Sequence, residues 1–581
     1  MQVNRSETVG AGFLAQGDIG LDRMMKSAAS GLSRLNVRRF ARDEDGHIVI
    51  FTTVMLTLML MLAGVGVDII NFETMRTKQQ QTLDRATLAA ASLTQELDAE
   101  EVVRDYFAKA DMADHLRSVS FERSFNASTV RAEAEKEVTP IFMNLYDLHN
   151  STKLVARGRS TAEQRINNIE IMLVLDVSGS MQGTKLTNLK SAASEFVDTV
   201  LDQDVENRVS IGIVPYNGQV NLPQYMQNLF TSVDDHGVSN VNCFDLPSTT
   251  YSSLTLSRTT GMPVTAHADT FSSTNTGGYI APTHANAVVN EGNRWCPPST
   301  VNVIRAPTNN RTQLKAHINN LTAIGATSIN AGMKWGMALL DPAANSLYTG
   351  FVSAGQTPAF FGNRPFAYGD REAMKIIVLM TDGEHFAEER VNAGFRAGNA
   401  PIWRGNSDTL FSVFHASRVN NSSSSNLCNS RPFYVPHLNA WHSRPWNGTA
   451  PNSSTCYSPS ASHSGVTQQT WPQIWSSVRM SWVAQQLYVR AIGGSQSATM
   501  NSLRTQTAIT TMDNQLQQIC SQSRTRNVLV YGIAFEAPSN GRTQIERCAS
   551  SPAHYFNAQG LEIRTAFRAI ATNITQLKLT Q

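Results

Sequence analysis

The feature that most constrains this chain is an uninterrupted apolar segment near its N-terminus. Ile48–Val67 is twenty residues long and contains no ionisable side chain. At about 1.5 Å per residue, a helix of this length spans about 30 Å, which matches the hydrocarbon core of a bilayer. We therefore predict a single transmembrane helix at residues 48–67. A cleaved secretory signal is the alternative, but a polar segment of 47 residues precedes the run instead of a brief basic leader.

Charges and cysteines bear on the orientation of this helix. Four arginines at residues 34–42 precede it and three basic residues at 76–85 follow it, a slight excess on the N-terminal side. All six cysteines lie after the span and form no Cys-x-x-Cys pair, which favours structural disulfides in an oxidising compartment over zinc or redox chemistry. Six cysteines allow 15 connectivities, and proximity favours neighbouring pairs, above all Cys520 with Cys548. We expect a cytoplasmic N-terminus and an extracytoplasmic C-terminal part.

The segments that flank the span differ in composition. Residues 1–47 are rich in Gly, Ser and charge without apolar periodicity, which predicts a mobile cytoplasmic tail. Residues 68–100 contain no Pro or Gly, so the helix is predicted to continue out of the membrane as a helical stalk. Their Ala-rich part, Thr87–Ser92, indicates either close packing against another helix or a solvated stalk. Residues 101–165 are interpreted as a stalk or linker region.

Residues 166–581 have the pattern of an α/β domain. Ile169–Leu175 is a compact apolar run that ends in Asp, as expected for a buried parallel strand. Lys185–Leu201 places apolar residues at spacings of three and four, which indicates an amphipathic helix. Strands that alternate with helices predict a doubly wound, mostly parallel sheet flanked by helices. Further strands of this sheet are predicted at residues 209–214, 375–380 and 528–535.

Two long segments interrupt this alternation, at about residues 234–310 and 388–472. Both are crowded with Ser, Thr, Asn, Pro and Gly, and each holds two cysteines and several aromatic residues. Disordered linkers are one interpretation, but the cysteines favour disulfide-tied surface loops. Both insertions leave the domain near strand ends, where an α/β sheet has its binding site.

Oxygen-bearing side chains follow three of the predicted elements. Asp176, Ser178 and Ser180 come directly after the first strand, Thr327 stands just before the predicted helix 329–340, and Asp382 follows another strand. Because parallel strands end at one edge of a sheet, these residues are expected to meet there. Carboxylate and hydroxyl oxygens are hard ligands, which suit Mg²⁺ or Mn²⁺ and disfavour zinc and copper. The alternative is a set of loops that cap helix N-termini.

The same five residues resemble the metal-ion-dependent adhesion site of the von Willebrand factor A family. Its pattern is Asp-x-Ser-x-Ser with a later Thr and a later Asp, and all five positions are present. The resemblance implies that Ser178, Ser180 and Thr327 contact the metal directly or through water. It implies that Asp176 and Asp382 act mainly through water, and that an acidic side chain of a partner protein completes the metal shell.

Six further segments carry a second resemblance: Asp43–Gly46, Val67–Asp68, Leu83–Ala90, Cys548–Ser550, Tyr555–Ala558 and the final helix from Leu561. They resemble TadG-like proteins of Flp (tight adherence) pilus assembly. The resemblance implies an assembly factor anchored in a bacterial inner membrane, with its C-terminal domain in the periplasm and an envelope or pilus-assembly protein as its partner. One position departs from the pattern, because prepilin-like relatives have Glu five residues after the cleavage-site Gly, whereas Phe51 stands five residues after Gly46. Processing as a pilin subunit is therefore not expected.

The function that the sequence predicts is metal-dependent protein binding in pilus assembly or anchoring, with adhesion to an outside surface as the alternative. An enzyme is not expected, because His-Glu-x-x-His, Gly-x-Ser-x-Gly and Walker motifs are missing, although a site within the insertions is the remaining enzymatic alternative. The formal charge is only +2 and there is no long basic run, so nucleic acid is not expected as a partner. A small-molecule substrate is not expected either.

Overall fold

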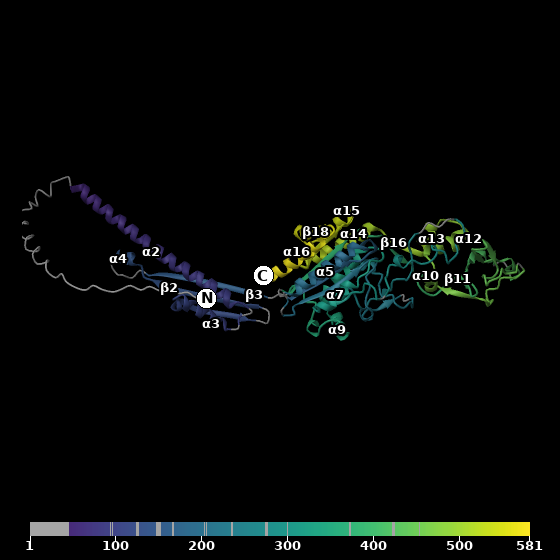
Figure 1. Cartoon of the computed structure of the whole chain (residues 1–581), viewed down its shortest axis with the longest axis horizontal. Helices are drawn as coiled ribbons and strands as arrows, with labels where there is room; N and C mark the ends of the chain where they lie inside the picture. The colour runs from purple at the N-terminus through teal and green to yellow at the C-terminus, as the bar shows by residue number, and fades with distance from the viewer. Residues whose placement is uncertain are drawn as a thin grey trace, which may run out of the picture. The chain divides into compact units, whose positions relative to one another are not determined.

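The computed structural model divides the chain into two compact units (Figure 1). Unit 1 contains residues 1–122 and 129–163, and unit 2 contains residues 123–128 and 164–581. The predicted cytoplasmic tail falls almost entirely outside the described residues. The structure describes residues 46–580 except 93–94, 96, 124–126, 147–152, 166–167, 203, 205, 234–235, 273–276, 299, 371–372, 421–423 and 453.

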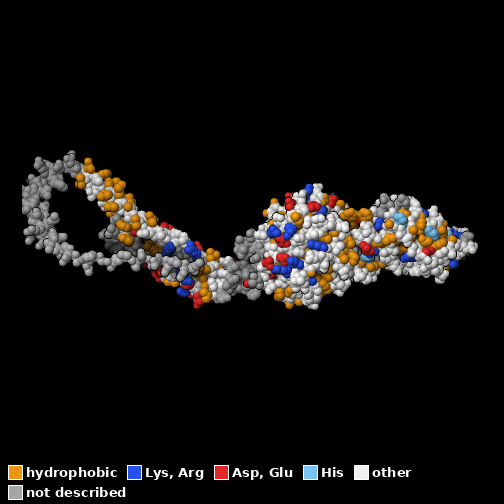
Figure 2. Space-filling model, viewed as in Figure 1, with side chains coloured by type: hydrophobic (Ala, Val, Ile, Leu, Met, Phe, Trp, Pro, Cys, Tyr) orange, Lys and Arg blue, Asp and Glu red, His pale blue; other side chains and the backbone are white. Residues whose placement is uncertain are grey.

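Unit 1 is built on one long helix, α2 (Gly46–Ala90). Among the described residues, α2 alone is long and apolar enough to cross a membrane, and its N-terminal half is exposed and covered with hydrophobic side chains (Figure 2). The C-terminal half packs on a three-stranded sheet, where the buried Gln79 amide donates to the carbonyls of Ala134 (3.0 Å) and Ala156 (3.2 Å). The other elements of unit 1 are α3 (Ala99–Lys109), β1 (Leu116–Arg123), β2 (Ala127–Val138), α4 (Ile141–Tyr146) and β3 (Leu154–Arg165).

The region interpreted above as a stalk or linker, 101–165, is therefore a folded layer on α2. Its strands were not predicted because small residues occupy most of their buried positions, such as Ala132 and Ala134 in β2. Buried and charged residues therefore alternate with little hydrophobic contrast. Of the two interpretations of the Ala-rich segment, close packing holds. Ala90 and Ala91 are buried in one cluster with residues of α3.

Unit 2 is centred on a six-stranded sheet. The order of its strands is β18-β17-β9-β4-β5-β8. The first five are parallel, and β8 joins the edge antiparallel to β5. The bounds are β4 (Asn168–Asp176), β5 (Val209–Tyr216), β8 (Arg305–Thr308), β9 (Ala373–Thr381), β17 (Leu529–Phe535) and β18 (Tyr555–Ala558).

Alternate residues of β4 belong to two separate hydrophobic clusters, one on each face of this sheet. Ile171 and Leu173 pack with helices α5 (Thr184–Asp202), α7 (Arg311–Asn319) and α16 (Glu562–Thr580). Met172 and Val174 pack with α8 (Ile329–Leu340), α14 (Ile509–Thr525) and α15 (Ser539–Cys548). Burial on both faces explains why β4 is a continuous apolar run. The predicted α/β class is confirmed, although antiparallel sheets elsewhere make the chain a mixed α/β protein.

The two insertions are ordered where the structure describes them, and they share a hydrophobic core. Ala266 and Ala287 from the first insertion pack with residues of the second, such as Ile402 and Trp475. Contrary to the prediction, the second insertion does not end near residue 472. It ends near Thr507, which pairs with Glu388 at the start of the insertion. Its elements are β10 (Glu388–Val391), β11 (Asn399–Gly405), β12 (Phe411–Phe414), β13 (Phe433–Val435), β14 (Ala440–His442), β15 (Val466–Thr470), α10 (Trp471–Ser477), α11 (Met480–Trp482), a π-helix (Val483–Val489), α12 (Arg490–Ile492), α13 (Gln496–Leu503) and β16 (Arg504–Thr507).

All six cysteines form disulfides between neighbours in sequence, as proximity predicted. Cys243 pairs with Cys296 in the first insertion, and Cys428 pairs with Cys456 in the second. Cys520 pairs with Cys548, which links α14 to α15. Each insertion is thus tied by its own disulfide, and the third bridge fixes two helices of the sheet domain.

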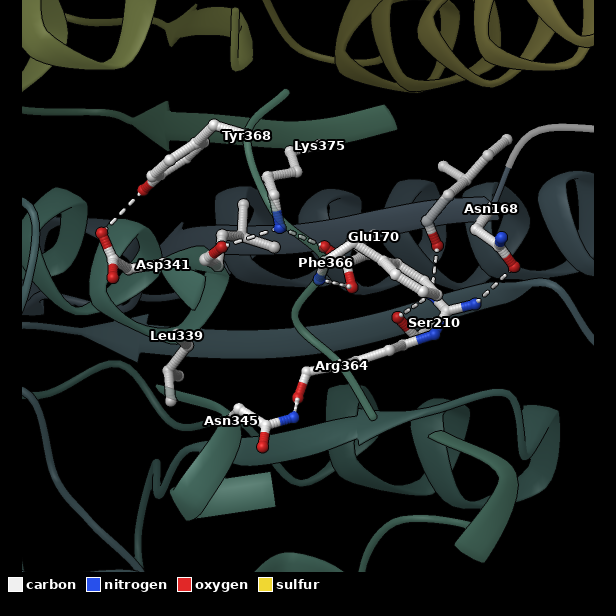
Figure 3. A network of polar contacts seen from close by, with 12 residues as sticks. Asn168, Glu170, Ser210, Leu339, Asp341, Asn345, Arg364, Phe366, Tyr368 and Lys375 are labelled. Atoms are coloured by element: carbon white, nitrogen blue, oxygen red, sulfur yellow. Dashed lines mark hydrogen bonds and ion pairs between the residues drawn. The ribbon is translucent and has the colours of Figure 1, made fainter. Parts of the chain in front are cut away.

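A buried network of charged and polar side chains lies at the amino ends of the central strands (Figure 3). Arg364 donates to the carbonyl of Ile169 (2.9 Å) and to Ser210 Oγ (2.8 Å), which joins the starts of β4 and β5. Lys375 of β9 donates to the Glu170 carboxylate of β4. Because charged groups are buried at low cost only when paired and hydrogen-bonded, this network fixes the starts of the three strands in register. The predicted site residues lie at the opposite, carboxyl ends.

Candidate metal site

The first loop of the candidate site begins where β4 ends. Asp176 is fully buried, and its carboxylate accepts hydrogen bonds from the Ser178 backbone N–H (2.8 Å) and from Thr381 Oγ1 (2.6 Å). Thr381 is the last residue of the neighbouring strand β9, so the parallel pairing of the two strands places these groups side by side. The loop then turns through a short 3-10 helix, Gly179–Met181, and leaves Ser180 exposed.

The three loops meet at this strand end. Ser180 Oγ lies 3.0 Å from Ser178 Oγ and donates to Asp382 Oδ1 at 2.6 Å. The Thr327 loop is joined to the first loop because the Gly179 N–H donates to the Gly325 carbonyl (2.9 Å). A Cβ placed on Gly383 would lie 3.5 Å from Thr327 Oγ1 and 3.9 Å from Ser180 Oγ, so both hydroxyls lie close to the residue that follows Asp382. The structure thus brings together all five residues singled out in the sequence.

The electrostatics of this cluster favour a bound cation. Burial, followed by the nearby Asp382 carboxylate, raises the pKa of Asp176 to about 6. Two buried carboxylates and three hydroxyls form a hard, all-oxygen donor set, which fits Mg²⁺ or Mn²⁺. Within the described part of the chain, no group of three or more His, Cys, Asp or Glu residues is placed to hold a metal ion. In any metal shell at this strand end, the hydroxyls would supplement the two carboxylates.

One cationic residue of the site, Lys185, was not predicted from the sequence. Lys185 lies in the first turn of α5, and its ammonium donates to Asp382 Oδ2 at 2.9 Å and lies 3.8 Å from Glu536 Oε2. This lysine partly balances the charge of the Asp382 carboxylate. Its position at the start of the helix that follows the Asp-x-Ser-x-Ser loop could have indicated its proximity, because a helix N-terminus faces the end of the preceding strand.

A buried histidine positions the Thr327 loop and was also missed. His385 Nε2 accepts a hydrogen bond from the Asn330 N–H (3.0 Å) at the start of α8, so Nδ1 carries the proton and donates to Asp513 (2.7 Å). Burial lowers the pKa of His385. In the same loop, the Phe386 N–H donates to the Thr327 carbonyl (2.9 Å). The chain that follows Asp382 therefore holds the Thr327 loop in place.

An aromatic hollow adjoins the oxygen-bearing residues of the candidate metal site. It has a volume of about 150 Å³ and shares Gly325 and Ala326 with the Thr327 loop. The Phe386 ring centroid lies 6.3 Å from that of Phe271 and 6.2 Å from that of Trp295. Phe271 and Trp295 come from the first insertion, so this insertion forms part of the rim of the site.

Comparisons with known proteins place one segment in a family. Residues 46–93 match the Tad family model, described as Flp pilus-assembly TadE/G-like. No curated protein matches the chain.

Among solved structures, the von Willebrand factor domain of the type V pili tip protein Mfa5 from Porphyromonas gingivalis is 11% identical, with 71% of this chain and 96% of that chain covered and a TM-score of 0.29. The pilus adhesin SpaC from Lactobacillus rhamnosus GG is 10% identical, with 80% of this chain and 34% of that chain covered and a TM-score of 0.25. The adhesive tip pilin GBS104 from Group B Streptococcus agalactiae is 11% identical, with 70% and 99% covered and a TM-score of 0.27. The family match thus covers residues 46–93 alone, and these residues are similar to the TadE/G-like model of Flp pilus assembly.

Proposed function

We propose that this protein is a membrane-anchored docking factor of Flp pilus assembly, and that unit 2 binds a partner protein through Mg²⁺ or Mn²⁺. The observation that carries the proposal is the convergence of three loops, which places two buried carboxylates and three hydroxyls at one strand end. We take unit 2 to be a von Willebrand factor A-type domain with a doubly wound sheet. The parallel strands β18 to β5 and the helices packed on both faces support this assignment.

The charge balance explains why such a site would bind an acidic partner. Asp176 and Asp382 together offset one divalent cation, and the Lys185 ammonium beside Asp382 can offset an additional carboxylate that a partner brings into the metal shell. The cation would in turn stabilise the buried Asp176 anion, whose pKa is raised by burial and by Asp382. Docking of an acidic partner is therefore the role that we propose for this site.

The aromatic hollow supplies the second element of recognition. A partner carboxylate at the metal would place its neighbouring residues over Phe271, Trp295 and Phe386. An apolar side chain beside the acidic residue would be desolvated there, which adds affinity and selects among acidic segments. The first insertion thus contributes to partner choice.

Affinity capture tests the docking function. Residues 164–581, immobilised and mixed with an envelope extract, should retain a protein in Mg²⁺ and release it in EDTA. Asp176→Ala and Ser180→Ala should abolish this retention. Ser252→Ala is the matched control, because its exposed hydroxyl bonds only within its own turn, to the Thr249 carbonyl at 2.7 Å. Retention that is equal in Mg²⁺ and EDTA would contradict the proposal.

A reporter fusion tests the proposed location, with the N-terminus in the cytoplasm and unit 2 in the periplasm of a bacterial inner membrane. Alkaline phosphatase requires an oxidising compartment to form its disulfides. Fused after Glu100, it should be active. An inactive fusion that is stably produced would show that the chain has the opposite orientation.

A further inference from the structure

Helix α4 of unit 1 begins against the end of the apolar run of α2. Asp68, the first charged residue after that run, is only 4% exposed. Its Oδ1 accepts from the Ile141 N–H (3.0 Å), and its Oδ2 accepts from the N–H groups of Phe142 (2.8 Å) and Met143 (2.7 Å). The carboxylate thus satisfies three of the N–H groups that the start of a helix leaves unpaired.

A second contact lies inside the apolar run itself. A Cβ placed on Gly64 would lie 2.7 Å from both Cγ and Cδ1 of Phe142, so this ring occupies the space beside Gly64. Around Gly66, in contrast, a Cβ would meet no atom within 4 Å. Gly64 precedes Asp68 by four residues, or about 6 Å along a helix. The Phe142 ring therefore lies at the level of α2 residues that are themselves apolar.

The exposed surface next to this contact is apolar. Ile141 is 73% exposed, and its neighbours Phe142 and Met143 are half-buried. On α2, the adjacent Val67 and Ile70 are exposed as well. The segment Ile141–Asn144 carries no ionisable side chain. Such a surface suits hydrocarbon rather than water or a charged partner.

We propose that α4 is a second membrane contact, whose Ile141 and Phe142 side chains enter the edge of the bilayer that α2 spans. The proposal rests on the membrane anchoring in the proposed function, since the contact with Gly64 places Phe142 at the depth of the span. At this boundary, the three N–H groups that donate to the Asp68 carboxylate replace the water that it loses. The folded layer of unit 1 is thereby fixed to the membrane surface at two points.

Depth-dependent fluorescence quenching tests this proposal in the full chain. Because all six native cysteines are in disulfides, a new cysteine gives a single reactive thiol. An environment-sensitive fluorophore is attached at Ile141→Cys, at Leu56→Cys within the span, and at Phe121→Cys on β1. The protein is reconstituted in phosphatidylcholine and phosphatidylglycerol vesicles that contain nitroxide-labelled lipids.

The fluorophore at position 141 should be quenched by lipids labelled at shallow depth, that at 56 by lipids labelled deeply, and that at 121 by neither. Quenching at position 56 with none at position 141 would overturn the proposal and leave the membrane anchor intact. This is the result expected if the exposed face of α4 binds another protein instead of lipid. Absence of quenching at 56 would overturn the anchoring itself, and with it this proposal.

Two glycine variants provide a matched pair. Gly64→Ala introduces a methyl group into the Phe142 ring and should reduce the quenching at position 141 toward the level at 121, while quenching at 56 is retained. Gly66→Ala meets no neighbour and should leave all three positions unchanged. Equal quenching at 141 in both variants would show that the Gly64 contact does not set the depth of α4, which would overturn the proposal.

Discussion

Replacement of Asp176 by asparagine should stabilise unit 2 when metal is withheld at neutral pH. In the folded protein, burial and the Asp382 carboxylate raise the pKa of Asp176 from 3.8 to about 6. The folded state therefore binds more protons than the unfolded state between these two values, and stability falls as pH rises through about 6. Above that pH the ionised carboxylate costs roughly 3 kcal/mol, from about 1.4 kcal/mol for each unit of pKa.

Asparagine removes this cost and retains much of the geometry. Its amide oxygen can accept from the Ser178 N–H, and its amide nitrogen can donate to Thr381 Oγ1, which now accepts instead of donating. The exchange of charge-assisted for neutral hydrogen bonds loses about 1 kcal/mol. The expected net gain in the free energy of unfolding is about 1 to 2 kcal/mol at pH 7.5, from the difference between these two terms.

Urea denaturation of residues 164–581 in EDTA, with disulfides intact, measures this difference. The advantage of Asp176→Asn should be present at pH 7.5 and disappear at pH 4.5, where the wild-type carboxyl is largely protonated in the folded state. Saturating Mg²⁺ should reverse the order, because only the wild type gains the full free energy of metal binding. A variant that is destabilised equally at both pH values in EDTA would refute the electrostatic account.

Three further substitutions probe the surroundings of the site. Lys185→Gln removes an ammonium that competes for Asp382 and should tighten Mg²⁺ binding by about 1 kcal/mol, or roughly fivefold in calorimetry; weaker binding would show that the lysine organises the site instead. Gly541→Ala places a methyl group against the Gly383 carbonyl, so it should lower the free energy of unfolding by about 1 to 3 kcal/mol and weaken Mg²⁺ binding. Gly394→Ala meets no neighbour and should change neither the stability nor the Mg²⁺ affinity. Phe386→Ala should weaken partner capture and leave Mg²⁺ affinity within about twofold, since its ring lines only the aromatic hollow; an equal loss of both would place the ring in the metal site.

The central strands and the convergence of the site residues could be predicted because burial on both faces leaves a strong sequence pattern. Ile169–Leu175 is apolar throughout, and the residues that follow such strands must gather at one edge of a parallel sheet. The same rule could have indicated that Lys185 lies near this edge, but neither its pairing with Asp382 nor the role of His385 could be found in this way. Their roles depend on side-chain contacts across the fold, with Asp382 for the lysine and with Asn330 and Asp513 for the histidine.

The remaining misses have a common physical basis in weak or misleading hydrophobic patterns. The strands of unit 1 bury alanines, which contrast little with their charged neighbours. In the second insertion, helices near its end have apolar residues such as Trp475, Trp482 and Leu503 that look like those of the main domain. Only the pairing of Glu388 with Thr507 shows where the insertion closes.

A crystal of residues 164–581 grown with Mn²⁺, examined by anomalous diffraction, tests the central claim most directly. The predicted result is one strong peak within about 2 to 5 Å of oxygens from Ser178, Ser180 and Thr327, with Asp176 and Asp382 in reach directly or through water. A Mn²⁺-saturated crystal without a peak at this strand end, or with its strongest peak elsewhere on the protein, would contradict the account.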